Sequence, residues 1–272
     1  MDVFRQVVEF NNQGVVTAQQ QGNDVQWHDQ IQFYQGALRG ILGLLDEPSV
    51  CLSLQRFEAS VSSISTESTS AISDSRACCR IYSDRLSSWT RPLQSNDNHF
   101  VEGVFLGEQV VFARTLNLVP SMTAYSDDPF INVTIATSIV LFNLAVTYHQ
   151  HCLKHQEDGQ ICNRAMLLKT ISLYKKAQDT LNDLALPRIG SGGKAVTELV
   201  TMAIQNNLGQ VCNALGDYDG AGVYYSRLIH FASSVNPEQY DDEETAVLLD
   251  LHKSYFLTNA FAFAPPTTAS AA

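Results

Sequence analysis

The sequence predicts a mainly helical protein whose helices fold back on one another in pairs, and residues 204–228 carry the main observations. Apolar residues recur at the spacing of a helix face on both sides of a break at Gly216. Gly209 lies within the first stripe, where glycine costs roughly 1 kcal/mol relative to alanine, so a second helix is expected to cross there too closely for a β-carbon. Gly216 and Asp217 then supply a left-handed stop and a cap for the next helix. The facing positions are Ile204, Leu208, Val211, Cys212, Leu215, Ala221, Tyr225 and Leu228.

A first helical hairpin is predicted over residues 3–45, from helices at 3–20 and 24–45. Gly14 lies on the apolar side of the first helix, as Gly209 does in residues 204–228. Pro48 ends the hairpin. The apolar positions are Val7, Phe10, Val15 and Ala18 in the first helix, and Ile31, Tyr34, Ala37, Leu38, Ile41 and Leu45 in the second.

Residues 58–76 and 77–120 differ in character from the helical parts. Between Ser60 and Ser75 there are eight Ser and two Thr. Such a segment buries too little apolar surface to offset its ordering entropy, so 58–76 is predicted to be a mobile loop, either a plain linker or a phosphorylated regulatory loop. Residues 77–120 are rich in β-branched and aromatic residues, which predicts an inserted β-hairpin or three-stranded β-patch with a tight turn at Gly107-Glu108.

Two further hairpins are predicted over residues 129–235, followed by a last helix. Asp127-Asp128-Pro129 is typical of a helix start, and that helix is expected to run to about His155. The next helix starts near residue 160 and ends before Pro187. After residues 204–228, a capping helix is predicted over 237–262, and residues 265–272 are expected to be disordered.

The spacing of these residues resembles the tetratricopeptide repeat (TPR), a helix-turn-helix unit of roughly 34 residues with small residues where its helices cross. The match is carried by Leu208-Gly209, Gly216, Ala221 and Tyr225, with Gly209 and Ala221 twelve residues apart and Pro237 as a late closing proline. Residues 142–148, FNLAVTY, resemble the first TPR helix, and 170–177, TISLYKKA, the second. The resemblance implies one TPR-like domain over 1–272, an α-α superhelix interrupted over 46–128.

The repeats are degenerate. The small residues Gly14, Ala145 and Gly209 are separated by 131 and 64 residues, which are not multiples of 34. In this respect the chain is similar to the lineage-expanded TPR-like proteins of microalgae.

Composition limits the classes of partner. The net charge is -11 and the pI about 4.9, so neither nucleic acid nor an anionic membrane is an expected partner. The N-terminus lacks the apolar core of a signal peptide, and the uncharged stretch 129–156 contains too many polar residues for a preferred membrane span. Six cysteines without a C-x-x-C pair indicate reduced thiols. We therefore expect an intracellular, cytoplasmic protein.

Two motifs contain residue types that could support chemistry. Residues 188–195, RIGSGGKA, depart from a phosphate-binding loop at Arg188 and Ala195 and follow a helix, so a flexible interhelical loop is predicted. His149, His151 and His155 cluster at a helix end; His151 and His155 share a face, which leaves a metal-dependent enzyme as an alternative. The preferred interpretation is a solvated helix end, with no metal, no cofactor and no catalytic residues.

One set of polar residues repeats with the small ones. Asn12, Asn143 and Asn207 each stand two residues before the small residue of their hairpin. The TPR resemblance implies that first helices line a concave groove in which such asparagines bind the main chain of a partner, because an amide offers both a donor and an acceptor. Gln210, Asn213 and His149 would lie a turn further along. The alternative is that these asparagines fasten one repeat to the next.

The sequence therefore predicts a non-catalytic protein-protein interaction scaffold that binds a segment of another protein. The groove faces lack the Lys and Arg with which chaperone-binding TPR proteins hold acidic tails, so such tails are not expected partners. A permanent structural subunit of a larger assembly is the other binding-class alternative.

Overall fold

The structure is a computed structural model that describes residues 3–19, 26–45, 104–106, 109–112, 115–118, 125–157, 164–182, 184, 189–240 and 242–263. This part of the chain is mainly helical. The predicted loop 58–76 and the predicted tail 265–272 lie outside the described residues. The elements are α1 (Val3–Gln19), α2 (Gln26–Leu45), β1 (Val104–Leu106), β2 (Gln109–Val111), α5 (Pro129–Glu157), α6 (Arg164–Asn182), α7 (Ser191–Ala214), α8 (Tyr218–Ser234), the 3-10 helix η2 (Pro237–Gln239) and α9 (Glu243–Phe263).

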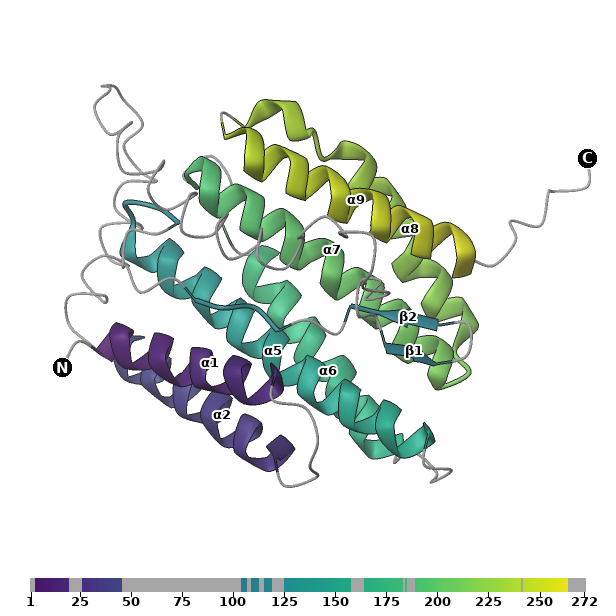
Figure 1. The fold of residues 1–272 in the computed structure, drawn as a ribbon, viewed down its shortest axis with the longest axis horizontal. Helices are drawn as coiled ribbons and strands as arrows, with labels where there is room; N and C mark the ends of the chain where they lie inside the picture. The colour runs from purple at the N-terminus through teal and green to yellow at the C-terminus, as the bar shows by residue number, and fades with distance from the viewer. Residues whose placement is uncertain are drawn as a thin grey trace, which may run out of the picture.

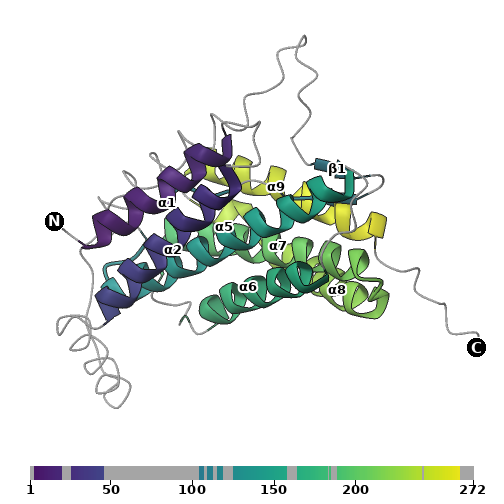
Figure 2. The ribbon, with the colours of Figure 1, turned by 90° about the horizontal axis from the view of Figure 1, so that it is seen from below.

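The helices pack in consecutive pairs, α1 with α2, α5 with α6, and α7 with α8. Figure 1 shows the pairs stacked in chain order, from α1 and α2 on one side to α8 and α9 on the other. In the perpendicular view of Figure 2, α5 and α7 lie in the middle of the stack. The last helix, α9, packs against both α7 and α8. The helical pairs predicted from residues 3–45 and 129–235 are therefore present as helices that contact one another.

Side-chain caps fix the ends that the sequence predicts. Gly216 has φ 75°, the left-handed conformation that glycine adopts without strain. Asp217 Oδ1 then accepts a hydrogen bond of 2.9 Å from the Gly220 amide at the start of α8. At the start of α5, Asp128 Oδ1 accepts one of 2.9 Å from the Phe130 amide. These contacts confirm the stops and starts predicted at both sites.

Two of the three predicted small residues, Gly14 and Gly209, lie where paired helices cross. A β-carbon on Gly14 would lie 2.7 Å from Tyr34 Cε1, and one on Gly209 would lie 2.6 Å from Tyr225 Cε1. Ala145, the corresponding residue of α5, is completely buried. The tyrosine of the second helix thus packs directly onto the backbone of the first, and an added methyl group has no room.

Replacing Gly209 with alanine is expected to lower the free energy of unfolding by about 1–3 kcal/mol, because overpacking against Tyr225 outweighs the better helix propensity of alanine. Urea unfolding measures the change. Gly36→Ala is the matched control, because its β-carbon would meet Phe10 at an ordinary 3.4 Å; this change should be neutral or stabilising by up to about 1 kcal/mol. Equal stabilities of the two variants would contradict the close crossing.

Two predicted segments differ from the structure. Residues 191–195, predicted as part of a flexible loop, form the first turn of α7. Gly193 allows this because its Cα approaches the Tyr125 carbonyl so closely that a β-carbon would lie 2.5 Å from that oxygen. The last helix begins at Glu243 and not at residue 237, because Asn236 and Pro237 start the separate turn η2.

Two short strands, β1 and β2, pair antiparallel with Phe105 opposite Val110. They fall within the range 77–120 for which a β-rich insertion is predicted. Most of that range lies outside the described residues, so the inserted β-hairpin or β-patch remains a prediction.

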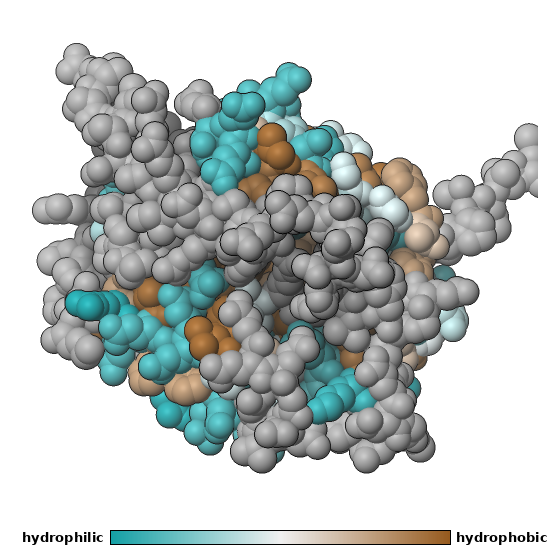
Figure 3. Space-filling view, viewed as in Figure 1, coloured by the Kyte–Doolittle hydropathy of each residue, from teal (hydrophilic) through white to brown (hydrophobic). Residues whose placement is uncertain are grey.

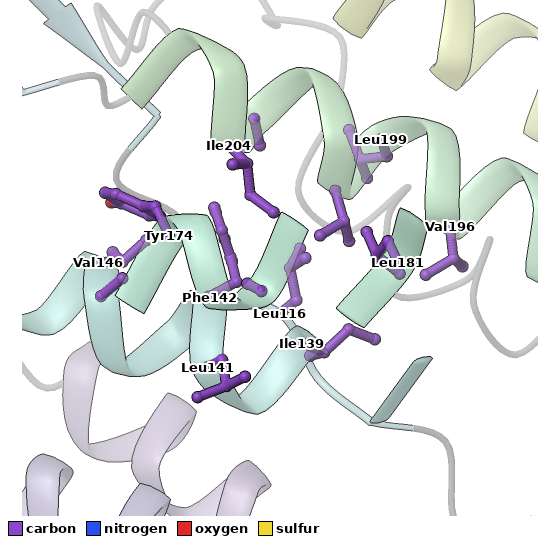
Figure 4. Close-up of a cluster of buried hydrophobic side chains, with 14 of the residues drawn as sticks. Leu116, Ile139, Leu141, Phe142, Val146, Tyr174, Leu181, Val196, Leu199 and Ile204 are labelled. Atoms are coloured by element: carbon purple, nitrogen blue, oxygen red, sulfur yellow. The ribbon is translucent and has the colours of Figure 1, made fainter. Parts of the chain in front are cut away.

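The core is centred on α5. Figure 4 shows Phe142 and Ile139 of α5 among Tyr174 and Leu181 of α6 and side chains of α7. In the part of the chain that the structure describes, one helical stretch, Pro129–Lys154, is long and apolar enough to cross a membrane, with a window of mean hydropathy 1.8. Because 89% of that window is buried inside the protein, and a core helix meets the same test, this is weak evidence for a span.

Candidate functional site: asparagine clamps on an inner segment

The candidate site lies where helices α1, α5 and α7 meet one non-helical stretch of the chain. This stretch, which we call the inner segment, comprises Phe112 and residues 115–118 and follows strand β2. It crosses the first helices of the three pairs in reverse order, from α7 at Phe112 through α5 at Leu116 to α1 at Leu118. Leu116 and Leu118, two residues apart, turn their main-chain groups to the helices as alternate residues of an extended chain do.

Three asparagine side chains hold the inner segment by its main chain. Asn207 Oδ1 accepts from the Phe112 amide at 2.9 Å, and its Nδ2 donates to the Phe112 carbonyl at 2.9 Å. Asn143 contacts Leu116 in the same way at 2.7 and 2.8 Å, and Asn12 contacts Leu118 at 2.8 and 3.0 Å. Each amide thus satisfies both polar main-chain groups of one residue. These are the three asparagines predicted to bind main chain, but here the bound main chain belongs to the same protein.

A second set of asparagines, which the sequence prediction missed, supports these clamps. Asn11 Nδ2 donates to the Leu116 carbonyl at 3.0 Å, and Asn11 Oδ1 accepts from Asn143 Nδ2 at 2.9 Å. On the other side, Asn206 Oδ1 accepts from Asn259 Nδ2 of α9 at 3.2 Å. The doublets Asn11-Asn12 and Asn206-Asn207 were the available signal in the sequence. The contacts join neighbouring helix pairs, as the repeat-fastening alternative expects, while the clamps hold a separate segment.

Apolar side chains anchor the inner segment between the helices. The Phe112 ring lies 5.3 Å from the ring of Phe256 on α9 and 6.3 Å from that of Phe142 on α5. Leu116 and Leu118 are completely buried, and Figure 4 shows Leu116 among the side chains of α5 and its neighbours. The inner segment is thus held both by hydrogen bonds to its main chain and by the burial of these three apolar side chains.

His149 and Asn213, predicted on the groove surface, contact the second helices of their own pairs. His149 Nδ1 lies 3.4 Å from the Tyr174 hydroxyl, and Asn213 Nδ2 donates to the Tyr225 hydroxyl at 3.3 Å. Each stands four residues after the small residue of its helix, so it lies on the face that crosses the second helix. Complete burial lowers the pKa of His149 to about 3 and raises the pKa of Tyr174 well above its usual range.

Gln210 lies one turn along α7 from Asn207 and is completely buried. Within the described residues, neither its Oε1 nor its Nε2 has a hydrogen-bond partner. A buried amide without partners is rare and destabilising. Of the six predicted binding residues, Gln210 is therefore the one whose side chain makes no hydrogen bond in the described part of the chain, while His149 leaves only its Nε2 without a partner.

The histidines proposed as an alternative metal site point to different neighbours. His149 faces Tyr174, while the His151 ring stacks on Trp27 of α2 at 3.9 Å. The side chain of His155 lies outside the described residues. Among the side chains that are described, no group of three His, Cys, Asp or Glu residues could hold a metal ion.

Comparison of the chain with protein-family models finds no match, and searches of curated proteins and of solved structures find none either. The function proposed for the groove therefore rests on its own contacts, above all on the three asparagine amides that hold the inner segment.

Proposed function

We propose that this chain is a non-catalytic protein-interaction scaffold whose groove binds an extended polypeptide segment by its main chain. The observation that carries the proposal is the repeated geometry of Asn12, Asn143 and Asn207, which make two hydrogen bonds each to single residues of the inner segment. An enzyme site would need a converging set of acid, base or nucleophilic groups. Here the converging groups are neutral amides, which suit recognition of peptide groups.

The arrangement also supports a TPR-like origin. In two of the three pairs, a glycine of the first helix meets a tyrosine of the second helix, and in the third the corresponding Ala145 is buried. In all three, the asparagine two positions earlier holds the inner segment. A small-residue crossing fixes the angle between paired helices, so successive first helices present their asparagines along one line. The amides of three first helices hold residues that are four and then two positions apart, so together they bind one stretch of main chain.

The proposal is tested by affinity capture from the cells that express the chain, with Asn12→Ala as the groove variant. Asn12 is only half-buried, at the Leu118 end of the inner segment, so the fold should tolerate this change better than changes at Asn143 or Asn207. We expect partners of the wild-type chain to be lost or reduced several-fold. Asn182→Ala, at the exposed end of α6, is the matched control and should retain them. Equal retention by both variants would count against the groove.

A second candidate function is favoured by α9, whose outer face carries three exposed apolar side chains. Val247, Leu251 and Phe261 lie on one face of α9 and are each more than half exposed. Brown, hydrophobic atoms are visible in Figure 3 along the side where α9 runs in Figure 1. Such a face is typical of a surface covered in an assembly, as in the permanent-subunit alternative.

Light scattering of the purified chain separates these functions. A stable monomer across the micromolar range favours transient segment binding. Self-association that Phe261→Ser abolishes would favour the subunit function.

A further inference from the structure

Resting on the proposed function, we propose that the inner segment is an exchangeable self-ligand. A partner segment displaces it when that segment carries an aromatic residue followed by aliphatic residues four and six positions later. The pattern is that of Phe112, Leu116 and Leu118, the three deeply buried apolar residues of the inner segment. The side chains of the inner segment therefore indicate which residue types a partner segment needs and how far apart they must lie.

Exchange requires no particular side chain at the asparagine clamps, because these amides hydrogen-bond only to peptide groups. The six hydrogen bonds from Asn12, Asn143 and Asn207 all end on main-chain N–H or C=O groups. Any extended segment can supply the same groups at the same spacing. Specificity then comes from the side-chain pockets, chiefly the aromatic contacts of Phe112 with Phe142 and Phe256.

Gln210 gives a partner an advantage over the inner segment. Its amide is buried, stands one turn from Asn207 and has no partner in the described part of the chain. A segment that places one hydrogen-bonding group against this amide would satisfy an atom that the inner segment leaves unsatisfied. The groove would then hold such a segment more tightly than its own.

The inner segment competes by being part of the same chain. Residues 119–128 join it to α5, which begins at Pro129, and a short tether gives an effective concentration on the order of millimolar. An identical segment added in trans at about 0.1 mM should therefore occupy only about a tenth of the grooves. Weakening the binding of the inner segment tenfold should raise the fraction of grooves occupied by the added segment to about half.

A labelled synthetic peptide with the sequence of residues 104–118, VFLGEQVVFARTLNL, tests the exchange by fluorescence anisotropy with the full chain. Phe112→Leu in the full chain weakens the binding of the inner segment while keeping an apolar side chain at this position. We expect the peptide to bind this variant about fivefold to tenfold more tightly than it binds the wild-type chain. Leu118→Val serves the same purpose if circular dichroism shows that Phe112→Leu has not folded. Unchanged affinity in the folded variant overturns the proposal.

Two modified peptides test whether binding depends on hydrogen bonds to the peptide main chain. N-methylation of the residue corresponding to Leu116 removes the N–H that donates a hydrogen bond to Asn143 Oδ1. We expect this peptide to bind at least tenfold more weakly. The matched control is N-methylation of the residue corresponding to Asn117, which is equally intrusive but should have a much smaller effect. Equal affinities of the two peptides overturn the proposal.

Failure of exchange can be distinguished from failure of the groove function. If Asn12→Ala loses captured partners but neither segment variant raises peptide affinity, the partners bind near Asn12 without replacing the inner segment, and the exchange proposal fails while a protein-interaction function stands. If the partners are retained by Asn12→Ala as well, the proposed function itself fails.

Discussion

Replacing Asn207 with leucine is expected to lower the free energy of unfolding by about 3–5 kcal/mol. The change removes the partner of both the Phe112 amide and the Phe112 carbonyl, and it also removes the donor to the Tyr174 hydroxyl. Leucine has nearly the same shape as asparagine, so the loss comes from buried groups left without partners and not from a cavity. Urea unfolding followed by circular dichroism measures it.

Asn213→Leu is the matched control, because it makes the same substitution on the same helix. Asn213 is only half-buried and donates one long hydrogen bond, of 3.3 Å, to Tyr225. We expect a loss of about 1 kcal/mol or less. If Asn207→Leu were as mild as Asn213→Leu, the clamp on Phe112 would contribute little, and the inner segment would be held by its apolar side chains alone.

The asparagine clamps show how much of the site could be predicted from the sequence. The chemistry followed from local features, because Asn12, Asn143 and Asn207 share one position relative to the small crossing residues. The occupant did not follow, since Phe112 and Asn207 are 95 residues apart and nothing local connects them. Residues 77–120 were assigned to a β-rich insertion as a whole, and this concealed a segment that binds helix side chains and not another strand.

The positions of His149 and Asn213 show a different limit. Helix bounds and crossing points were predictable because glycine, proline and capping residues act locally. The facing direction of a polar residue was assigned from its distance to the groove asparagine, six residues in both helices. A side chain six residues along a helix lies on a different face. A side chain four residues after Ala145 or Gly209 lies on the same face as that small residue, where the second helix crosses.

Acid is expected to destabilise the protein through His149. Burial lowers its pKa to about 3, against an ordinary value of 6.5. Above pH 6.5 the imidazole is neutral in both folded and unfolded chains, so it contributes no pH dependence. Between pH 6.5 and about 3 the unfolded chain binds a proton that the folded chain does not, so stability falls as pH falls, by about 1.4 kcal/mol per pH unit. At pH 5 this amounts to about 2 kcal/mol.

His149→Gln should remove this part of the acid sensitivity while keeping a group that can hydrogen-bond to Tyr174. Urea unfolding at pH 7 and pH 5 measures the difference, which should shrink by about 2 kcal/mol relative to the wild-type chain. His230→Gln, at an exposed histidine of α8, should keep the wild-type difference. A His149→Gln chain as acid-sensitive as the wild type would mean that His149 takes up its proton without unfolding. The imidazole would then reach solvent through an opening of α5 and α6, and the tight packing of that helix pair around Tyr174 would not hold in solution.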